Sequence, residues 1–351
     1  MRILVQCMAG IGDTLLASPI FSEIKLAHPE AEMDALVMYA GSVDVLKGNP
    51  AIHRIIQINL LKENPATILR KLWELRHAGY DLTVCAHPQS RTAYRGIAGI
   101  IGSPLRASHV YEASGWIDKL LVNRTIEQDY TLHTVDNNRN LLEVLGLRHP
   151  SFVPKVNLFP SNAEEEFAAN YELKENAGRR QWIGVHVGSG STKNLILKRW
   201  PLNRWSELFE LIRGNSDRRI LLFGGPEEKE AHAYFLNQFP GLCVVAPTRN
   251  LREVGPLMKK CSAFISVDTA LMHIAAAVEV ASQIVIEGVT LNPTNFPFRQ
   301  TPYSVARNPL IKNRYLDFYR YDGHPIRATD EQMRVIMSAV QAEEVFRLLP
   351  S

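Results

Sequence analysis

Short apolar runs alternate with longer amphipathic stretches along most of the chain. In the first half, runs typical of buried strands precede segments whose apolar residues recur every three or four positions, as in helices that face a core. This alternation with short connections predicts a doubly wound parallel sheet. The predicted strands are residues 2–7, 33–39, 52–58 and 81–87, and the predicted helices are 15–27, 43–50, 65–80 and 133–146. No element is assigned between residues 88 and 132.

The same alternation starts again at residue 182, after a polar segment at about 162–180. Residues 329–349 are predicted to form one amphipathic helix, which opens with a capping box at Thr329. We therefore expect an α/β protein with two Rossmann-like domains, at residues 1–165 and 175–325, and a C-terminal helix within 326–351. The predicted strands of the second half are residues 182–188, 219–225, 243–246, 263–268 and 282–289, and its predicted helices are 205–213, 227–237, 251–261 and 270–279.

Composition narrows the functional classes. The 351 residues suffice for two domains, and a net charge of +3 gives no reason to expect nucleic acid as a partner. Four isolated cysteines predict neither a zinc site nor a disulfide framework. The apolar stretch 270–289 contains His273, Glu279 and Glu287, which are costly in lipid, so we expect a helix and a strand there instead of a membrane span. The expectation is a cytoplasmic protein without a signal peptide, cofactor or metal.

A glycine-rich turn follows the first strand. Gly10 and Gly12 begin a dinucleotide-binding pattern, but Leu15 stands where the third glycine belongs, and the second strand ends without an acidic residue. Both departures argue against NAD. What remains is a turn that places Asp13 at the start of a helix. The carboxylate either stabilises that helix or acts as a general base, and the helix dipole would weaken it as a base.

Three later motifs also follow predicted strands, where open α/β sheets bind ligands. The loop 188–192 can hold phosphate oxygens, and the nearby Lys198 and Arg199 can add charge, although a loop of this composition can also be plain surface. Glu228 can bind ribose hydroxyls. Asp268 and Thr269 are predicted to cap a helix, with His273 one turn on, and a core histidine is the alternative for the latter.

Taken together, "GIGDTLLASPIFSEIK", "KRWP", "FGGPEEKE" and "DTALMHIAAA" resemble glycosyltransferase family 9, the ADP-heptose:lipopolysaccharide heptosyltransferases, over nearly the whole chain. The resemblance implies a GT-B fold, with two Rossmann-like domains facing across a cleft, the first for the acceptor and the second for the nucleotide-sugar. It also implies inversion without a metal, with Asp13 as base and Gly10, Gly12 and Thr14 in the acceptor-side loop. The donor-binding residues it implies are Ser189, Gly190, Ser191, Thr192, Lys198, Glu228, Asp268, Thr269 and His273.

Two departures from the family pattern concern the donor. Ala270 replaces the glycine after Asp-Thr, and the segment 287–295 differs from the usual Phe/Tyr-Gly-x-Thr. Three hypotheses stay open: a glycosyltransferase acting on a glycan or lipid-linked acceptor, a nucleotide-sugar epimerase or hydrolase of the same fold, and a non-catalytic nucleotide-sugar-binding protein. A lipid-linked acceptor implies peripheral contact with the inner membrane. The helix 65–80 carries Trp73 and several basic residues that could touch headgroups, although its ordinary role is to cover the sheet.

Overall fold

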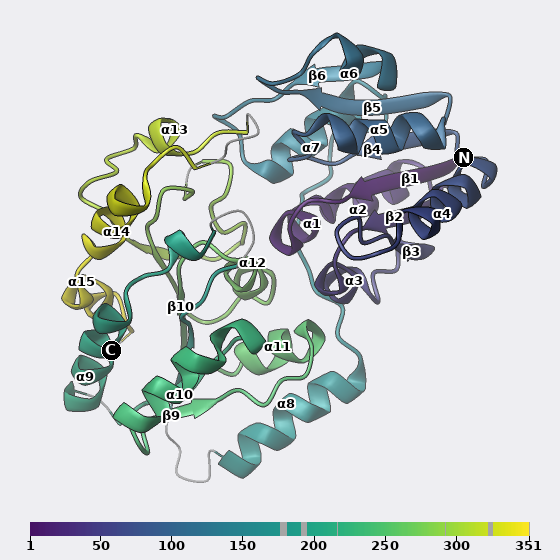
Figure 1. The fold of residues 1–351 in the computed structure, drawn as a ribbon. Coiled ribbons are helices and arrows are strands. Elements are labelled where there is room, and N and C mark those ends of the chain that lie inside the picture. Colours follow the sequence, from purple (N-terminus) through teal and green to yellow (C-terminus); the bar gives the residue numbers. More distant parts are fainter. Residues whose placement is uncertain (176–180, 191–194, 216, 292, 322–325, 351) are drawn as a thin grey trace. The chain divides into compact units, whose positions relative to one another are not determined.

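The computed structural model describes residues 1–175, 181–190, 195–215, 217–291, 293–321 and 326–350. The chain divides into two compact units (Figure 1). The first unit comprises Met1–Phe159 with Arg320–Pro325, and the second comprises Pro160–Tyr319 with Ile326–Ser351. Arg320 and Tyr321, which the sequence analysis placed in the C-terminal domain, therefore belong to the first unit.

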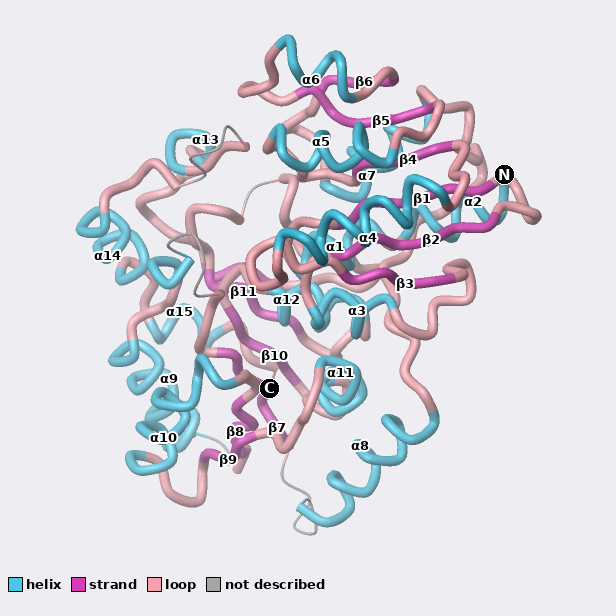
Figure 2. The backbone as a smooth tube through the Cα atoms, turned by 45° about the vertical axis from the view of Figure 1, so that its right-hand side comes forward, coloured by secondary structure: helices cyan, strands magenta, loops and turns pink. Residues whose placement is uncertain are grey.

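The first unit is built on a six-stranded parallel sheet with the order β3-β2-β1-β4-β5-β6 (Figure 2). The chain starts in the middle, moves to one edge and then returns to fill the other, which is the doubly wound order predicted from the sequence. Nearly every residue of the central strands is buried, as expected for a sheet covered on both faces. The strands are β1 Arg2–Cys7, β2 Glu32–Val37, β3 Arg54–Gln57, β4 Leu82–Cys85, β5 Leu105–Val110 and β6 Arg124–Glu127.

Helices cover both faces of this sheet. Helix α5 contacts α4 on one side and α6 on the other, so these three form one layer, whereas α1 contacts α3 and α7 in a second layer. The predicted helix 15–27 belongs to two helices that meet at Ser18, because Pro19, which starts the second, has no backbone N–H to continue the first. The helices are α1 Ile11–Ala17, α2 Pro19–Ala27, α3 Ala40–Leu46, α4 Pro65–His77, α5 Thr92–Ile101, α6 Trp116–Leu121 and α7 Thr134–Glu143.

The second unit repeats this topology. Its parallel sheet has the order β12-β11-β10-β7-β8-β9, which is the same winding read from the other edge. Figure 2 labels the run from β11 to β9. The polar segment before it is a regular helix, α8, that packs on α11. The strands are β7 Trp182–His186, β8 Arg219–Leu222, β9 Cys243–Val245, β10 Ala263–Ser266, β11 Gln283–Ile286 and β12 Ser304–Ala306. The helices are α8 Asn162–Glu175, η1 Leu195–Lys198, α9 Leu202–Asn215, η2 Pro226–Glu228, α10 Lys229–Gln238, α11 Leu251–Met258, α12 Ala270–Ala277 and α13 Tyr315–Phe318.

The C-terminal tail differs from the prediction of a single helix. It forms α14, Asp330–Ser338, and α15, Ala342–Arg347, separated by a short link. The predicted capping box is present, since Thr329 and Gln332 exchange hydrogen bonds between side chain and backbone. Helix α15 packs on α9, and Val340 and Val345 join the core of the second unit.

Candidate functional site

A buried ion pair joins Lys198 to Asp268 in the second unit. Lys198 Nζ lies 2.8 Å from Asp268 Oδ2, and about nine-tenths of each side chain is buried. The carboxylate of Asp268, which follows β10, also accepts a hydrogen bond from Thr290, and His273 Nε2 lies 4.0 Å from its Oδ1. Burial acts to raise the pKa of Asp268, but Lys198, His273 and the hydrogen bonds keep that pKa below its usual value. The carboxylate is therefore charged at neutral pH and holds a cation at the carboxyl end of β10.

Trp200 anchors the segment that carries Lys198. Lys198 is the last residue of η1, and the ring of Trp200, two residues later, is buried nearly perpendicular to that of Trp205, with the two ring centroids 4.9 Å apart. The indole Nε1 of Trp200 donates to the carbonyl of Val340, between α14 and α15, at 3.1 Å. The tryptophan of the "KRWP" motif thus belongs to the core, and the C-terminal helices limit where Lys198 can reach.

Thr269 is joined to His186 instead of capping its helix. It occupies the N-cap position of α12, but its side chain makes no cap hydrogen bond, and its Oγ1 lies 3.1 Å from His186 Nδ1. Asp268 is likewise engaged by Lys198, so the predicted capping pair is wrong. Burial, with smaller effects of His232 and Arg199, lowers the pKa of His186 to about 3. His186 is therefore neutral at physiological pH and acts as a fixed hydrogen-bonding group.

Glu228 lies at the turn after β8 and is almost fully buried. Its Oε2 accepts a hydrogen bond from the Gly225 amide at 2.8 Å, and its Oε1 lies 3.7 Å from Arg199 Nη2. A methyl group on Gly188 would come within 2.0 Å of this carboxylate, so glycine is required there for a close approach. Burial raises the pKa of Glu228 against the opposing effects of Gly225 and Arg199.

His186 connects these two groups of residues. Its Nδ1 faces Thr269, and its Nε2 lies 3.9 Å from Glu228 Oε1. The predicted donor residues Lys198, Glu228, Asp268, Thr269 and His273 therefore form one continuous cluster at the carboxyl ends of β7, β8 and β10. In this winding, that edge lies beside the switch point between β7 and β10, where such sheets bind ligands.

The Gly-Ser loop after β7 is described only in part. Ser189 is buried, and its carbonyl oxygen accepts a hydrogen bond from Arg199 Nη2 at 3.1 Å. Gly190 is exposed. Ser191 and Thr192, predicted to contact phosphate, lie outside the described residues.

In the first unit, Asp13 closes the turn after β1. Its Oδ2 accepts a hydrogen bond from the Gly10 amide at 2.8 Å, with Gly10 as the N-cap of α1, so Asp13 is the third helical residue and not the cap. Gly12 is partly exposed, as is Asp13 itself. Thr14 is buried, and its hydroxyl donates to backbone carbonyls of the turn, at 3.0 Å to Gly10 and 3.2 Å to Cys7. The turn thus fixes Asp13 while leaving part of its side chain accessible.

Asp13 and Arg91 act electrostatically on Tyr39 and Tyr94, and the sequence analysis assigned a role to neither tyrosine nor to Arg91. Burial raises the pKa of Tyr39, the charge of Asp13 raises it further, and Arg91 opposes both. The same charges act in the same directions on Tyr94. These residues follow β2 and β4, so the winding of the sheet brings them to the carboxyl end of β1. The charge of Asp13 therefore acts on two tyrosine hydroxyls, and the Arg91 guanidinium acts on the same hydroxyls in the opposite direction.

The model of glycosyltransferase family 9 (heptosyltransferase) matches residues 69–308, about two thirds of the chain. The chain belongs to glycosyltransferase family 9. Lipopolysaccharide heptosyltransferase 3 of Escherichia coli is 25% identical over 280 residues, covering 76% of this chain and 78% of that protein. A solved family 9 glycosyltransferase from Veillonella parvula has a TM-score of 0.76 at 18% identity, covering 99% and 95% of the two chains. The solved ADP-heptose LPS heptosyltransferase II of E. coli has a TM-score of 0.71 at 20% identity, covering 99% and 98%.

These likenesses confirm the GT-B fold class of two Rossmann-like units and the assignment as a glycosyltransferase. They do not assign the individual site residues, which rest on the geometry above. His186 and Thr290 were missed by sequence reasoning, whereas Arg199 was expected to add charge beside Lys198. His186 could have been noticed as a polar residue inside an otherwise apolar strand, whereas Thr290 lies in the segment that departs from the usual family pattern.

Within the segment 287–295, which departs from the family pattern, Glu287 makes contacts that hold the fold together. This carboxylate is buried and accepts hydrogen bonds from the Tyr315 hydroxyl and the Asn308 amide. Arg307 Nη1 lies 3.0 Å from it. Glu287 thus ties β11 to the chain after β12 and to α13, which is a structural role. The family departure that lies directly at the cluster is Ala270, the partly exposed first residue of α12.

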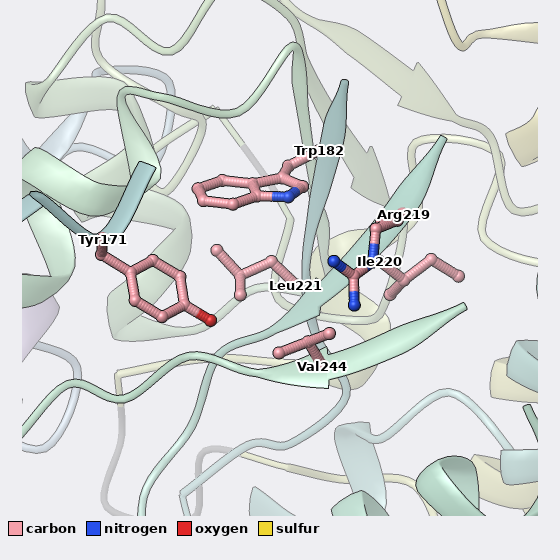
Figure 3. Close-up of a pocket in the computed structure, with 6 residues that line it drawn as sticks. All are labelled: Tyr171, Trp182, Arg219, Ile220, Leu221 and Val244. Carbon is pink, nitrogen blue, oxygen red and sulfur yellow. The ribbon is translucent and has the colours of Figure 1, made fainter. Parts of the chain in front are cut away.

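The small pocket drawn in Figure 3 is a different place in the second unit. It lies where β7 and β8 begin, at the edge of the sheet opposite the cluster. Its lining residues are Tyr171, Trp182, Arg219, Ile220, Leu221 and Val244.

The described residues contain no group of three or more histidine, cysteine or acidic side chains placed to hold a metal ion. Among the same residues, no helix is both long enough and apolar enough to cross a bilayer.

Proposed function

We propose that this family 9 glycosyltransferase moves heptose from an ADP-linked donor to the core of lipopolysaccharide or a related glycan, with inversion and without a metal ion. The observation that carries the donor half of this proposal is the buried pair of Lys198 with Asp268, at the start of α12. The names of the relatives support the substrates, since they are lipopolysaccharide and ADP-heptose heptosyltransferases.

The cluster of the second unit has the chemistry that a departing nucleoside diphosphate needs. Its negative charge grows as the bond to the sugar breaks, and fixed positive groups stabilise that charge. Lys198 supplies a full charge, the N-terminus of α12 supplies unpaired backbone amides, and His273 supplies a ring nitrogen. Glu228 is the group for the ribose hydroxyls. With these contacts from protein alone, the leaving group needs no metal.

The Asp13 turn provides the group that activates the acceptor hydroxyl in this proposal. In the proposed step, the Asp13 carboxylate takes the proton of an acceptor hydroxyl while that oxygen attacks the anomeric carbon. The bond to the diphosphate breaks on the opposite face, so the anomeric configuration is inverted. We assign the orientation of the acceptor hydroxyl to Tyr39 and Tyr94, on which the charge of Asp13 acts, together with Arg91.

The acceptor class also implies where the protein works. A lipopolysaccharide core under assembly is attached to a lipid anchor, so the enzyme must reach the surface of the inner membrane from the cytoplasmic side. Peripheral contact with that surface is accordingly part of this proposal.

The test is the variant Asp13→Asn, which keeps the size of the side chain and an oxygen that can accept from Gly10. We expect ADP binding, followed by calorimetry, to stay within about twofold, whereas transfer of heptose falls about 100-fold or more, because a general base is lost. Glu30→Gln, which removes an exposed acid of the same unit, is the matched control and should leave both unchanged.

Undiminished transfer by Asp13→Asn would show that another group removes the proton. Conversion of the ADP-sugar without any acceptor would replace transfer by epimerase or hydrolase chemistry. Loss of transfer on adding EDTA would refute metal independence, and retention of the anomeric configuration in the product, seen by NMR, would refute inversion.

A further inference from the structure

Helix α6 of the first unit exposes most of its apolar side chains. Trp116, Ile117 and Leu120, which we call the α6 strip, lie on one face of the helix and are 73%, 47% and 70% exposed. The acidic residue of the helix, Asp118, is buried, and its Oδ1 accepts a hydrogen bond from Arg95 at 2.6 Å. A helix that only covered a sheet would bury its apolar side chains and expose its acidic one.

The close fit of α6 on α5 keeps the α6 strip outward. A methyl group on Gly99 of α5 would come within 2.7 Å of Leu121, so the two helices touch at this glycine. With Leu121 and the pair of Asp118 with Arg95 facing inward, the α6 strip has no place in the core. Its exposure therefore follows from the packing of the described helices.

Helix α4, in the same layer, repeats the feature. Leu72 and Leu75 are buried, but Leu69 and Trp73, one turn apart, are 61% and 59% exposed. Helix α5 lies between α4 and α6 and contacts both. The layer thus carries two outward apolar strips, each with a tryptophan.

The part of the chain that contains this layer has a positive net charge. Residues 62–125 contain nine lysines and arginines against five acidic residues, whereas the whole chain has a net charge of only +3. Arg70, Lys119 and Arg124 are exposed on or beside the two helices, and Arg70 also pairs with the exposed Glu74 at 2.5 Å. An apolar surface rimmed by cations matches an anionic lipid surface, which offers hydrocarbon to tryptophan and leucine and phosphates to the basic side chains.

We propose that the α4–α6 layer is the surface by which the protein docks on an anionic phospholipid bilayer, with the α6 strip inserted among the headgroups. The inference rests on the proposed function to the extent that a lipid-linked acceptor requires such a surface. It adds which face meets the membrane. The sequence analysis considered α4 alone, because the exposure of the α6 strip is visible only in the fold.

The test uses vesicles of phosphatidylethanolamine and phosphatidylglycerol with the full chain. We expect Trp116→Ser/Leu120→Ser to lower binding in a sedimentation assay about tenfold or more, because two interfacial side chains are lost. Leu173→Ser/Val335→Ser, which removes two equally exposed apolar side chains from the second unit, is the matched control and should bind as the unchanged protein does. Binding should also weaken in high salt and without phosphatidylglycerol.

Tryptophan fluorescence adds a direct readout. Trp73 and Trp116 are exposed, whereas Trp182, Trp200 and Trp205 are almost fully buried. Brominated phospholipids in the vesicles should therefore quench the two exposed residues, and the quenching should fall in Trp116→Ser. Equal vesicle binding by the α6 variant and its control would overturn the proposal.

Two further outcomes separate this inference from neighbouring ones. Transfer to a soluble acceptor without its lipid should be unchanged in the α6 variant. If no transfer occurs with any variant while vesicle binding still depends on the α6 strip, the proposed function fails and the docking surface stands. The unchanged protein could instead form a dimer that Trp116→Ser/Leu120→Ser dissociates, and fail to bind vesicles. That result would assign the α6 strip to contact with a second copy of the chain and overturn the membrane-docking proposal.

Discussion

Lys198 Nζ and Asp268 Oδ2 lie 2.8 Å apart, with about nine-tenths of both side chains buried. The residues are 70 positions apart in the sequence and come from η1 and the turn after β10. An ion pair of this kind holds the lysine ready at the ligand edge of the sheet, because the carboxylate offsets the cost of burying the charge.

Replacing one partner of this pair should be worse for stability than replacing both. Lys198→Met leaves Asp268 buried without its cation, so we expect about 3–5 kcal/mol less stability, as for other broken buried pairs. Lys198→Met/Asp268→Leu removes both charges and should recover most of that loss. Calorimetric titration should nevertheless find ADP binding weak in both variants. Recovery of ADP binding in the double variant would mean that Lys198 does not hold the diphosphate.

The close approach of Gly188 to Glu228 gives a second prediction. In Gly188→Ala the new methyl would meet the carboxylate at 2.0 Å, so the Glu228 side chain must move away from Gly225. We expect about 1–3 kcal/mol less stability from overpacking, together with weaker ADP binding.

Gly214→Ala is the control for this prediction, since nothing lies within 4 Å of the methyl it adds, near the end of α9. It should be neutral or stabilise the protein by up to about 1 kcal/mol, because alanine favours helix more than glycine does. Thermal unfolding and ADP titration of the two variants, side by side, provide the measurement. Equal ADP affinities would show that Glu228 does not contact the donor.

The lowered pKa of His186 predicts that the folded protein loses stability in acid. His186 has a pKa of about 3 in the folded protein because of burial, against an ordinary value of 6.5. The unfolded chain therefore binds a proton first as the pH falls below about 6.5, and the stability of the folded state drops until about pH 3. Between pH 6.5 and pH 5 this one residue accounts for about 2 kcal/mol, at about 1.4 kcal/mol per pH unit.

The measurement is urea unfolding followed by tryptophan fluorescence, which reports on the second unit through Trp182, Trp200 and Trp205. In His186→Gln an amide can still bond Thr269, but nothing titrates, so the stability curve should be flatter between pH 6.5 and pH 5. Parallel curves for the two proteins would show that another group controls the acid sensitivity.

The sequence predicted the regular parts of both units well, since strand and helix periodicities are local properties of the chain. It assigned nothing between residues 88 and 132, where the structure has α5, β5, α6 and β6. The reason lies in particular residues. Ser108 and His109 of β5 are polar yet buried, and α6 exposes its apolar side chains, so neither segment shows the expected pattern.

In the candidate site, too, the sequence indicated some residues, whereas other contacts are visible only in the fold. The motifs indicated Lys198, Asp268 and His273 from their places after strands, and the fold brings these three together. The pairing of Thr269 with His186 could not be predicted, because a threonine before a helix ordinarily caps it, and only the neighbouring strand offers the histidine.

By itself, then, the sequence determined two doubly wound sheets, the strand ends at which chemistry gathers, and the family to which the motifs belong. These follow from periodicity and from turns of a few residues. The tertiary structure alone decided which charges are paired, which polar groups are buried, and that α6 faces outward. Those properties depend on neighbours that are distant in the chain, and burial makes each such contact far stronger than it would be in water.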